Sequence, residues 1–96
     1  MYNNYTESIL MFEFNKQKSS VNKDKHGIDF DEAQLLWEDI DRIIIPAKNV
    51  DEPRYLLVAR KDNRHWSAIF TIRNEKVRII SVRRSRHKEI EIYENG

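Results

Sequence analysis

The chain has 96 residues, no cysteine and a formal net charge of +1. This length allows one domain with a modest apolar core, and the 40% apolar content is typical of a folded chain. The lack of cysteine excludes a disulfide scaffold and a cysteine-ligated zinc site. Near the start, the longest apolar run is Ile9 to Met11, which is too short for a signal peptide, and no run is long enough to span a membrane. We therefore expect a cytoplasmic protein.

Charge is divided unequally along the chain. Residues 1–52 contain six Lys or Arg and eleven Asp or Glu, whereas residues 53–96 contain eleven Lys or Arg and five Asp or Glu. Such polarisation creates a field at the folded surface even when the net charge is near zero. A basic half is typical of a protein that binds nucleic acid or an acidic partner.

The N-terminal region shows a short extension before the domain. Residues 1–10 have no clear periodicity, so we expect a poorly ordered extension followed by a single domain over residues 11–96. The apolar residues within 11–14 predict a short strand at the start of that domain.

A first helix is predicted directly after this strand. Asn15 suits the N-cap, the helix continues to Lys25, and Gly27 suits the left-handed position after its C-terminus. Its only strongly apolar residue is Val21, and Lys25 and His26 lie in its last turn.

The clearest helical pattern runs from Ile28 to Ile40. Asp29 and Glu32 form the pattern of a capping box. One apolar face follows the i, i+3, i+4, i+7 spacing, with Ala33, Leu36, Trp37 and Ile40. The opposite face is acidic, with six Asp or Glu and no base from Asp29 to Asp41. We interpret it as a solvated face, and a docking surface for a basic partner is the alternative.

The second half predicts an antiparallel sheet. Ile43 to Ile45 ends at Pro46 and predicts an edge strand. Three longer runs with short connections follow: Tyr55 to Lys61, His65 to Arg73 and Lys76 to Arg83. Asp62-Asn63 and Asn74-Glu75 are candidate hairpin turns. In the middle run the apolar positions are Trp66, Ala68, Phe70 and Ile72, alternating with Ser67, Thr71 and Arg73.

The chain therefore predicts an α+β domain. Its expected order is one strand, two helices, a four-strand antiparallel meander and a closing helix. The closing helix is indicated by Ile90 and Tyr93, which lie three residues apart.

The most distinctive stretch is Lys76 to Tyr93. Val77, Ile79 and Val82 predict a central strand covered on both faces. A basic cluster follows, so that residues 76–88 contain six Lys or Arg and no acid. Arginine suits phosphate binding because its guanidinium stays charged and donates to two oxygens at once. A solvated basic start of a helix is the alternative interpretation.

Several kinds of chemistry are disfavoured by the residues present. His26, His65 and His87 are scattered without the spacing of metal ligands, and the only two glycines cannot form a glycine-rich phosphate loop. Cleavage of RNA needs no protein nucleophile, since the 2′-hydroxyl attacks the phosphate. It needs a base, an acid and cations that stabilise the transition state. The sequence contains that inventory, with no cofactor required.

A set of short motifs resembles the BrnT family of type II toxins, which are small ribonucleases with a RelE-like sheet. The motifs are Phe12-Glu13-Phe14-Asn15, Lys25-His26-Gly27, Phe30-Asp31-Glu32-Ala33, Arg60, Ile79-Ile80-Ser81-Val82-Arg83, Glu89 and Tyr93. They occur in the family's order over about residues 11–94. The resemblance implies a RelE-like α+β fold and a metal-independent endoribonuclease that stops translation. It also implies a cognate BrnA-like antitoxin with a ribbon-helix-helix domain, which would itself carry any contact with DNA.

The resemblance also indicates site residues. The catalytic candidates are Lys25, His26, Arg60 and Arg83. We expect the two arginines to clamp the scissile phosphate, while Lys25 adds charge and His26 or His87 moves the proton. Candidates for RNA binding are Arg84, Arg86, His87 and Lys88. Lys25 and His26 have an alternative role as cations that stabilise a helix C-terminus, and Arg60 as a solvated turn charge.

Two positions differ from the family pattern. Arg86 stands where Ser or Thr usually caps the last helix three residues before Glu89, with Ser85 one position earlier, and Ile90 stands where Arg is common. These differences leave two alternatives open. The first is a catalytically weak relative that binds RNA or an antitoxin. The second is an interaction domain whose acidic helix and basic sheet end pair with another protein.

Overall fold

The computed structural model describes residues 10–48 and 51–96. Residues 1–9 of the predicted extension over residues 1–10 lie outside the described residues, as do residues 49–50. The elements follow in the order β1 (Phe12–Glu13), α1 (Lys16–His26), α2 (Phe30–Ala33), η2 (Gln34–Glu38), β2 (Ile43–Ala47), β3 (Arg54–Lys61), β4 (Arg64–Arg73), β5 (Lys76–Arg84) and α3 (His87–Asn95).

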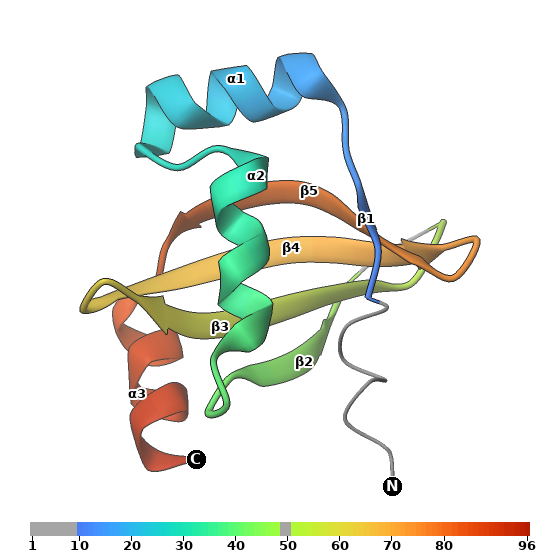
Figure 1. Ribbon diagram of the computed structural model, residues 1–96. Helices are drawn as coiled ribbons and strands as arrows, with labels where there is room; N and C mark the ends of the chain where they lie inside the picture. Colours follow the sequence, from blue (N-terminus) through green and yellow to red (C-terminus); the bar gives the residue numbers. More distant parts are fainter. Residues whose placement is uncertain (1–9, 49–50) are drawn as a thin grey trace, which may run out of the picture.

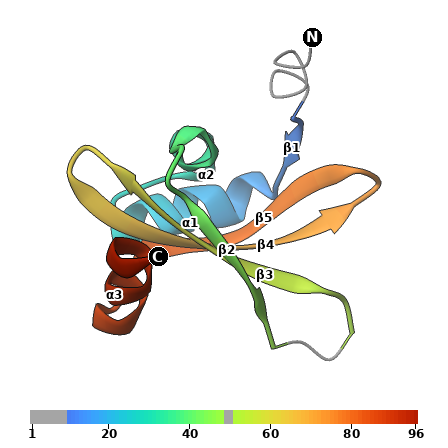
Figure 2. The same cartoon turned by 90° about the horizontal axis from the view of Figure 1, so that it is seen from below.

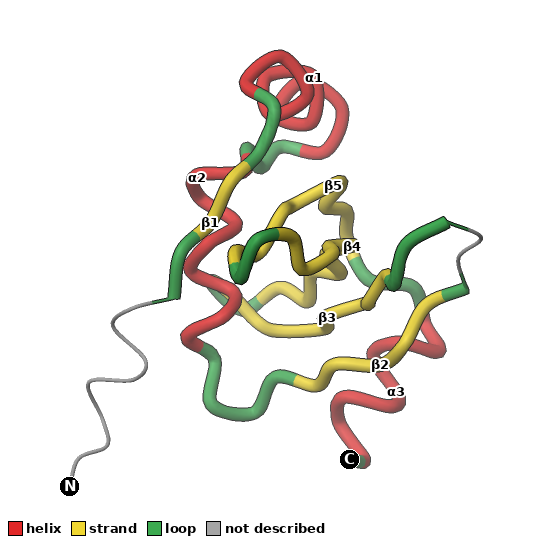
Figure 3. The backbone as a smooth tube through the Cα atoms, turned by 90° about the vertical axis from the view of Figure 1, so that its right-hand side faces the viewer, coloured by secondary structure: helices red, strands yellow, loops and turns green. Residues whose placement is uncertain are grey.

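The five strands form one sheet in the order β1-β5-β4-β3-β2. Strands β2 to β5 are an antiparallel meander, and β1 adds to β5 in the parallel direction. The predicted edge position of the proline-containing strand is confirmed, since β2 ends the sheet. Helices α1 and α2 lie on one face of this sheet and α3 lies on the other, at one end (Figures 1 and 2). In Figure 3, β1 runs beside the α1–α2 layer before the chain enters α1.

Helix α1 begins and ends as predicted but is anchored differently. Asn15 Oδ1 accepts a hydrogen bond from the Lys18 N–H at 2.9 Å, and Gly27 has a φ of 82°. Val21, the one strongly apolar residue of this helix, has a side chain that is 50% exposed. The buried contacts come from Ser19 and Asn22 instead. Helix α1 is therefore anchored through polar rather than apolar side chains.

Asn22 makes the hydrogen bonds that a neighbouring strand would otherwise make to Val82 on β5. Its amide donates to the Ile28 and Val82 carbonyls at 2.8 Å each, and its Oδ1 accepts from the Val82 N–H at 3.2 Å. Because β1 pairs only with Val77 and Arg78, the later part of β5 has no strand on that side. The asparagine replaces the missing strand, and α1 covers the open edge.

The second helix starts as predicted and stops early. The capping box is present: Asp29 Oδ1 accepts from Glu32 N–H at 2.7 Å, and Glu32 Oε1 accepts from Asp29 N–H at 2.9 Å. After four residues the α-helix becomes the 3₁₀ helix η2, which ends at Glu38. Asp39 has an extended backbone, so Ile40 lies beyond the end of the helix and outside the predicted apolar face, and its side chain is 86% exposed.

Both predicted hairpin turns are confirmed. Asp62, Asn63, Asn74 and Glu75 all have positive φ, between 52° and 65°. Two consecutive left-handed residues match the twist of the flanking strands in a two-residue hairpin. The β3–β4 turn fixes the register that pairs Arg60 with His65.

The main core lies between the sheet and the α1–α2 layer. Its buried apolar residues are Ile28, Phe30, Ala33, Leu36, Trp37, Leu57, Ala59, Trp66, Ala68, Phe70, Val77, Ile79 and Val82. Three expectations for the strands are wrong. Ile72 is exposed, Ser67 and Thr71 are buried, and Ser81 on β5 is exposed rather than covered. The register shifts between Ile69 and Phe70 opposite β5, and alternation alone does not predict a bulge.

The predicted α+β class is confirmed by this mixed sheet and helix architecture. Its details differ from the expected arrangement in two ways. The first strand joins the sheet in the parallel direction as a fifth strand, and the second helix is a short α-helix continued by 3₁₀ turns. Over residues 10–48 and 51–96, no helix is long and apolar enough to cross a bilayer.

Candidate active site

Four polar side chains share one face at one end of the sheet. Strands β3 and β5 both run antiparallel to β4, so their C-terminal ends lie at the same end of the sheet. Arg60 pairs with His65, and Arg83 pairs with Ser67 two residues further along β4. Directly paired residues lie on the same face, as do residues two apart. Arg60, His65, Ser67 and Arg83 therefore occupy one surface, which helix α3 covers in part. We call it the α3 face (Figure 2).

Glu89 is the centre of a hydrogen-bonded group that we call the Glu89 cluster: Ser67, Arg83, Ser85 and Glu89. The carboxylate accepts two bonds from the guanidinium, Nη1 to Oε1 at 2.9 Å and Nη2 to Oε2 at 2.8 Å. Ser67 Oγ donates to Oε1 at 2.8 Å and lies 2.7 Å from Ser85 Oγ. The side chains of Arg83 and Glu89 are only 25% and 13% exposed. The cluster thus fixes both charged groups.

The cluster also sets the protonation of its carboxylate. The bidentate bonds from Arg83 lower the pKa of Glu89 to about 2 against an opposing effect of burial, with help from the Arg86 N–H and the Ser67 hydroxyl. The same hydrogen bonds raise the pKa of Arg83, against burial. Both groups are therefore charged across the whole physiological range.

The start of α3 shows how the chain accommodates its difference from the family pattern. Arg86 occupies the N-cap, and its side chain has no acceptor atom for the helix N–H groups. Glu89 Oε1 still accepts from the Arg86 N–H at 2.8 Å, which completes half of a capping box. Ser85 turns its hydroxyl toward Ser67 instead of capping the helix. Glu89 is thus oriented by the sheet as well as by its own helix.

A second group of contacts holds the C-terminal half of α3. His65 Nε2 lies 2.7 Å from Glu94 Oε2, and the His65 ring meets the Tyr93 ring edge-on with centroids 5.3 Å apart. Tyr93 donates its hydroxyl proton to Asp39 Oδ2 at 2.7 Å, and the same oxygen accepts from the Arg60 N–H at 2.7 Å. Asp39 therefore connects the end of η2, the end of β3 and helix α3.

These contacts shift two further pKa values. Burial and the hydrogen bond to Asp39 raise the pKa of Tyr93 to about 12, so the phenol stays protonated. Burial alone would raise the pKa of Asp39, but the hydrogen bonds from the Arg60 N–H and the Tyr93 hydroxyl outweigh it, and the pKa is lowered.

The remaining catalytic candidates lie at the same end of the sheet but in the other layer. Lys25 and His26 are exposed residues of the last turn of α1, on the α1–α2 side. Within the described residues, neither side chain makes a hydrogen bond or an ion pair. The structure therefore brings together Arg60 and Arg83, and it does not bring Lys25 and His26 onto the α3 face.

The candidates for RNA binding are also divided between the two layers. The Arg84 guanidinium stacks over the Trp66 ring at 5.6 Å, on the side opposite Arg83. Arg86, His87 and Lys88 are exposed around the first turn of α3. His87 Nε2 lies 3.0 Å from Glu91 Oε2 along the outer surface of this helix.

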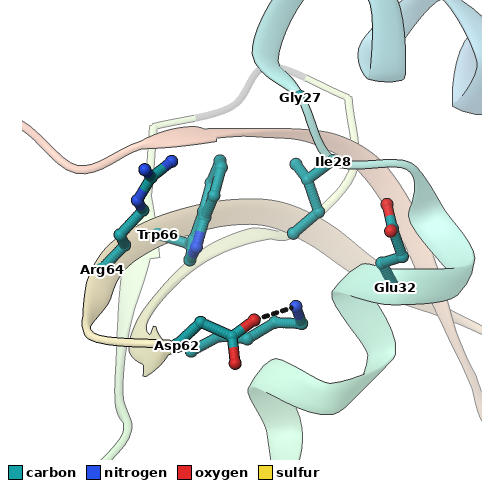
Figure 4. A pocket seen from close by; sticks show the side chains of 7 residues that line it. Gly27, Ile28, Glu32, Asp62, Arg64 and Trp66 are labelled. Atoms are coloured by element: carbon teal, nitrogen blue, oxygen red, sulfur yellow. Dashed lines mark hydrogen bonds and ion pairs between the residues drawn. The ribbon is translucent and has the colours of Figure 1, made fainter.

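A polar hollow of about 280 Å³ lies between the α1–α2 loop and the β3–β4 turn (Figure 4). Its lining consists of Gly27, Ile28, Glu32, Lys61, Asp62, Arg64 and Trp66. Lys61 Nζ and Asp62 Oδ2 form an ion pair at 2.8 Å at its edge. This hollow is next to the Lys25-His26 end of α1, and it is separated from the α3 face by the sheet.

Some residues of the site were missed by the sequence prediction. Ser67 and Ser85 appeared to be ordinary strand and turn residues, and His65 appeared only as a scattered histidine. The register of the Asp62-Asn63 turn was the available signal, because it pairs Arg60 with His65 and fixes which residues share a face. Asp39 carried no such signal, since it is distant in sequence from both of its partners.

The arrangement offers cations and hydrogen-bond groups rather than a metal-ligand set. Within the described residues, no group of three or more His, Cys, Asp or Glu side chains is placed to hold a metal ion. The α3 face combines a fixed guanidinium, a second arginine, a histidine and hydroxyl groups. Such a surface can bind a phosphodiester and stabilise added negative charge on it.

Comparison with known proteins identifies the family. No curated protein matches the chain. The family model described as "Ribonuclease toxin, BrnT, of type II toxin-antitoxin system" matches residues 14–89, which include helices α1 and α2, strands β2 to β5 and the Glu89 cluster. The chain belongs to the BrnT family of ribonuclease toxins of type II toxin–antitoxin systems.

Proposed function

We propose that this protein is a metal-independent endoribonuclease that inhibits translation by cutting RNA at the α3 face. The observation that carries the proposal is the pair of arginines, Arg60 and Arg83, on one face at one sheet end, in a chain whose family consists of ribonuclease toxins. A RelE-like relationship of the fold remains an expectation from the family resemblance.

Arg83 retains donors for a phosphate although Glu89 occupies part of its guanidinium. Glu89 accepts one N–H from each of Nη1 and Nη2, and the Arg84 carbonyl accepts from Nη1 at 3.2 Å. The Nε–H and the second N–H of Nη2 have no partner among the described residues. These two donors share one edge of the planar group, and that edge can bind two phosphate oxygens. In this proposal, Glu89 aims the guanidinium rather than blocking it.

The reaction uses the nucleophile that RNA itself carries. The 2′-oxygen loses its proton and forms a bond to phosphorus, the bond from phosphorus to the 5′-oxygen breaks, and the 5′-oxygen takes up a proton. The products are a 2′,3′-cyclic phosphate and a 5′-hydroxyl. Arg83 and Arg60 stabilise the extra negative charge of the pentavalent transition state, and no step requires a metal ion.

Lys25 and His26 are proposed to contact the RNA away from the scissile phosphate. They lie at the same sheet end as the arginines but in the α1 layer, so a strand that passes around this end can meet both regions. Arg86, His87 and Lys88 extend the basic surface along the start of α3. Their contribution is mainly electrostatic and should weaken with salt.

A type II system pairs its toxin with a protein antitoxin. We propose that this antitoxin is BrnA-like and carries a ribbon-helix-helix domain, so that DNA binding by the complex is a property of the antitoxin. Co-expressed with the neighbouring reading frame, the chain should purify as a complex that survives high salt, because obligate pairs bury apolar as well as charged surface.

A non-enzymatic alternative rests on one observation. The bidentate bonds to Glu89 occupy the end of the Arg83 fork, and only 25% of this side chain is exposed. If the remaining edge does not reach a phosphate, the protein would bind RNA or its antitoxin without turnover. This alternative predicts RNA binding at low salt with no cleavage.

The test is cleavage of a labelled messenger transcript by the toxin separated from its antitoxin, with and without EDTA. We expect cleavage with cyclic phosphate ends that is unchanged by EDTA, and inhibition of a cell-free translation reaction by the same preparation. Binding without cleavage would support the non-enzymatic alternative. Cleavage abolished by EDTA and restored by a divalent cation would contradict the metal-independent mechanism.

A further inference from the structure

We infer that His65 is the catalytic residue that accepts the 2′-hydroxyl proton, and that Glu94 is the positioning residue that orients it. This assignment deepens the proposed ribonuclease function and rests on it. It replaces the sequence expectation that His26 or His87 moves the proton.

The position of His65 between the two arginines carries the inference. Strand β4 lies between β3 and β5, and His65 pairs directly with Arg60. Ser67, two residues further along the same strand, pairs directly with Arg83. A phosphate held by both arginines would therefore lie over β4 at the level of His65, since diagonal neighbours in a sheet are about 7 Å apart at Cβ.

The contacts of His65 fix its ring and leave one nitrogen available. Nε2 lies 2.7 Å from Glu94 Oε2, and because an ionised carboxylate can only accept, we assign the proton of the neutral ring to Nε2, which donates a hydrogen bond to Glu94. The Tyr93 ring packs edge-on against the imidazole, whose side chain is 18% exposed. Within the described residues, Nδ1 makes no hydrogen bond. Nδ1 is thus a lone-pair acceptor on an oriented ring, which is the requirement for a general base.

The other two histidines lack this position. His26 lies at the end of α1 in the opposite layer, and His87 is almost fully exposed on the outer surface of α3, beside Glu91. Neither is paired in the sheet with a residue next to Arg60 or Arg83. His65 is the histidine that the fold places on the α3 face.

In the assigned step, Nδ1 of His65 takes the 2′-hydroxyl proton as the 2′-oxygen bonds to phosphorus. The bond from phosphorus to the 5′-oxygen breaks, and the 5′-oxygen is protonated by water. The resulting imidazolium carries a proton on each ring nitrogen. The Glu94 carboxylate stabilises it by accepting the hydrogen bond from Nε2. It returns its proton to solvent after the products leave, so protons and electrons balance.

The experiment compares single-turnover cleavage of one labelled transcript by the wild type, His65→Gln and His65→Ala. Glutamine can still donate to Glu94 but cannot accept a proton at neutral pH. We expect each variant to cleave at least about a hundredfold more slowly, the usual size of a general-base contribution, with RNA affinity within about twofold. Added imidazole should restore part of the rate of His65→Ala and none of that of His65→Gln, because only the alanine leaves room for it.

A control variant separates chemistry from stability. Thr71→Val, on the same strand, removes a hydrogen bond of 2.6 Å to the Pro53 carbonyl at the far end of β4. It should lower the melting temperature while the cleavage rate stays within about twofold. His65 variants that fold and cleave like the wild type, or slow cleavage that imidazole does not restore in His65→Ala, would overturn the assignment. If the wild type cleaves no RNA, the ribonuclease proposal itself fails.

Discussion

The two faces of the sheet are stabilised in different ways. On the α1–α2 face, apolar side chains such as Leu57, Ala59 and Ala68 are completely buried against the helices. On the α3 face, the covering helix has no buried residue of its own and is held by Glu89, Tyr93 and Glu94 through polar contacts. One face supplies the stability of the fold, and the other fixes charged groups in defined positions.

This difference has a physical consequence for mutation. Removing an apolar side chain from the first face loses burial and leaves a cavity, which affects the whole domain. Removing a polar side chain from the α3 face loses hydrogen bonds of partly exposed groups, and this loss costs less stability. Activity and stability should therefore respond to different residues, and the following changes test that separation from the largest expected effect to the smallest.

The largest effect is expected for Arg83→Ala. Removing a cation that acts mainly on the transition state typically slows a reaction about a hundredfold or more. We expect at least this loss in single-turnover cleavage and no growth arrest on induction. Antitoxin binding should be retained, and Arg83→Lys should rescue poorly because an ammonium offers no fork.

Arg73→Ala is the matched control for that substitution. Arg73 is an exposed arginine at the other end of β4 with a weak contact to Glu52 at 3.5 Å. Its removal should leave cleavage and growth arrest unchanged. A folded Arg83→Ala protein that still cleaves RNA would show that the assigned phosphate site is wrong.

The second effect concerns stability alone. Trp37→Ala should lower the free energy of unfolding by about 3–5 kcal/mol, because Trp37 is buried and meets Phe12 and Phe70 edge-on. Ile40→Ala is the control from the same predicted helix face, and it should change the unfolding free energy by less than about 0.5 kcal/mol. Urea denaturation measures both. Equal effects of the two variants would contradict the observed end of the helix.

A smaller loss is expected when α1 loses its polar anchor. Asn22→Ala removes three hydrogen bonds, to the Val82 N–H and to two carbonyls, at a net cost of about 0.5–1 kcal/mol each and about 1.5–3 kcal/mol in all. Ser20→Ala, on the exposed side of the same helix, should cost almost nothing. Hydrogen exchange of the Val82 amide gives a direct readout, and unchanged protection in Asn22→Ala would refute the anchoring role.

The smallest effect is a pH dependence of stability. The folded-state pKa of Glu89 is about 2, below the usual carboxyl value of 4.5, so its stabilisation is complete above about pH 4.5 and is lost as the pH falls toward 2. Allowing for solvent screening, we expect about 1–3 kcal/mol from this group. Glu89→Gln should remove that part of the acid sensitivity in urea denaturation between about pH 6 and pH 3. Glu91→Gln, exposed on the same helix, should retain it.

Much of the fold could be predicted because local signals were unambiguous. Asn15 and Gly27 mark the ends of α1, the Asp29–Glu32 pair marks the start of α2, and Pro46 marks the edge strand. The turns at Asp62-Asn63 and Asn74-Glu75 indicated which strands pair in the meander. Each of these signals acts over a few residues, where backbone geometry decides the outcome.

The errors arose where packing over long sequence separations decides. Ile40 is exposed because the helix ends at Glu38, and helix α1 is anchored by Asn22, which bonds to Val82 of β5, sixty residues away. The site was partly predicted for a similar reason. The shared position of Arg60 and Arg83 at one end of the sheet follows from the directions of their strands. The roles of Ser67 and Asp39 depend on contacts that no local pattern indicates.

In the proposed mechanism, RNA binds and is cut on the α3 face. The most direct test is an NMR titration of the isotope-labelled toxin with a 2′-O-methyl RNA, which lacks the nucleophile and cannot be cleaved. We expect the largest amide shifts at Arg60, His65, Ser67 and Arg83, smaller shifts at Lys25 and His26, and none at core residues. Shifts confined to the α1 end and the neighbouring polar hollow, with an unaffected α3 face, would contradict this mechanism.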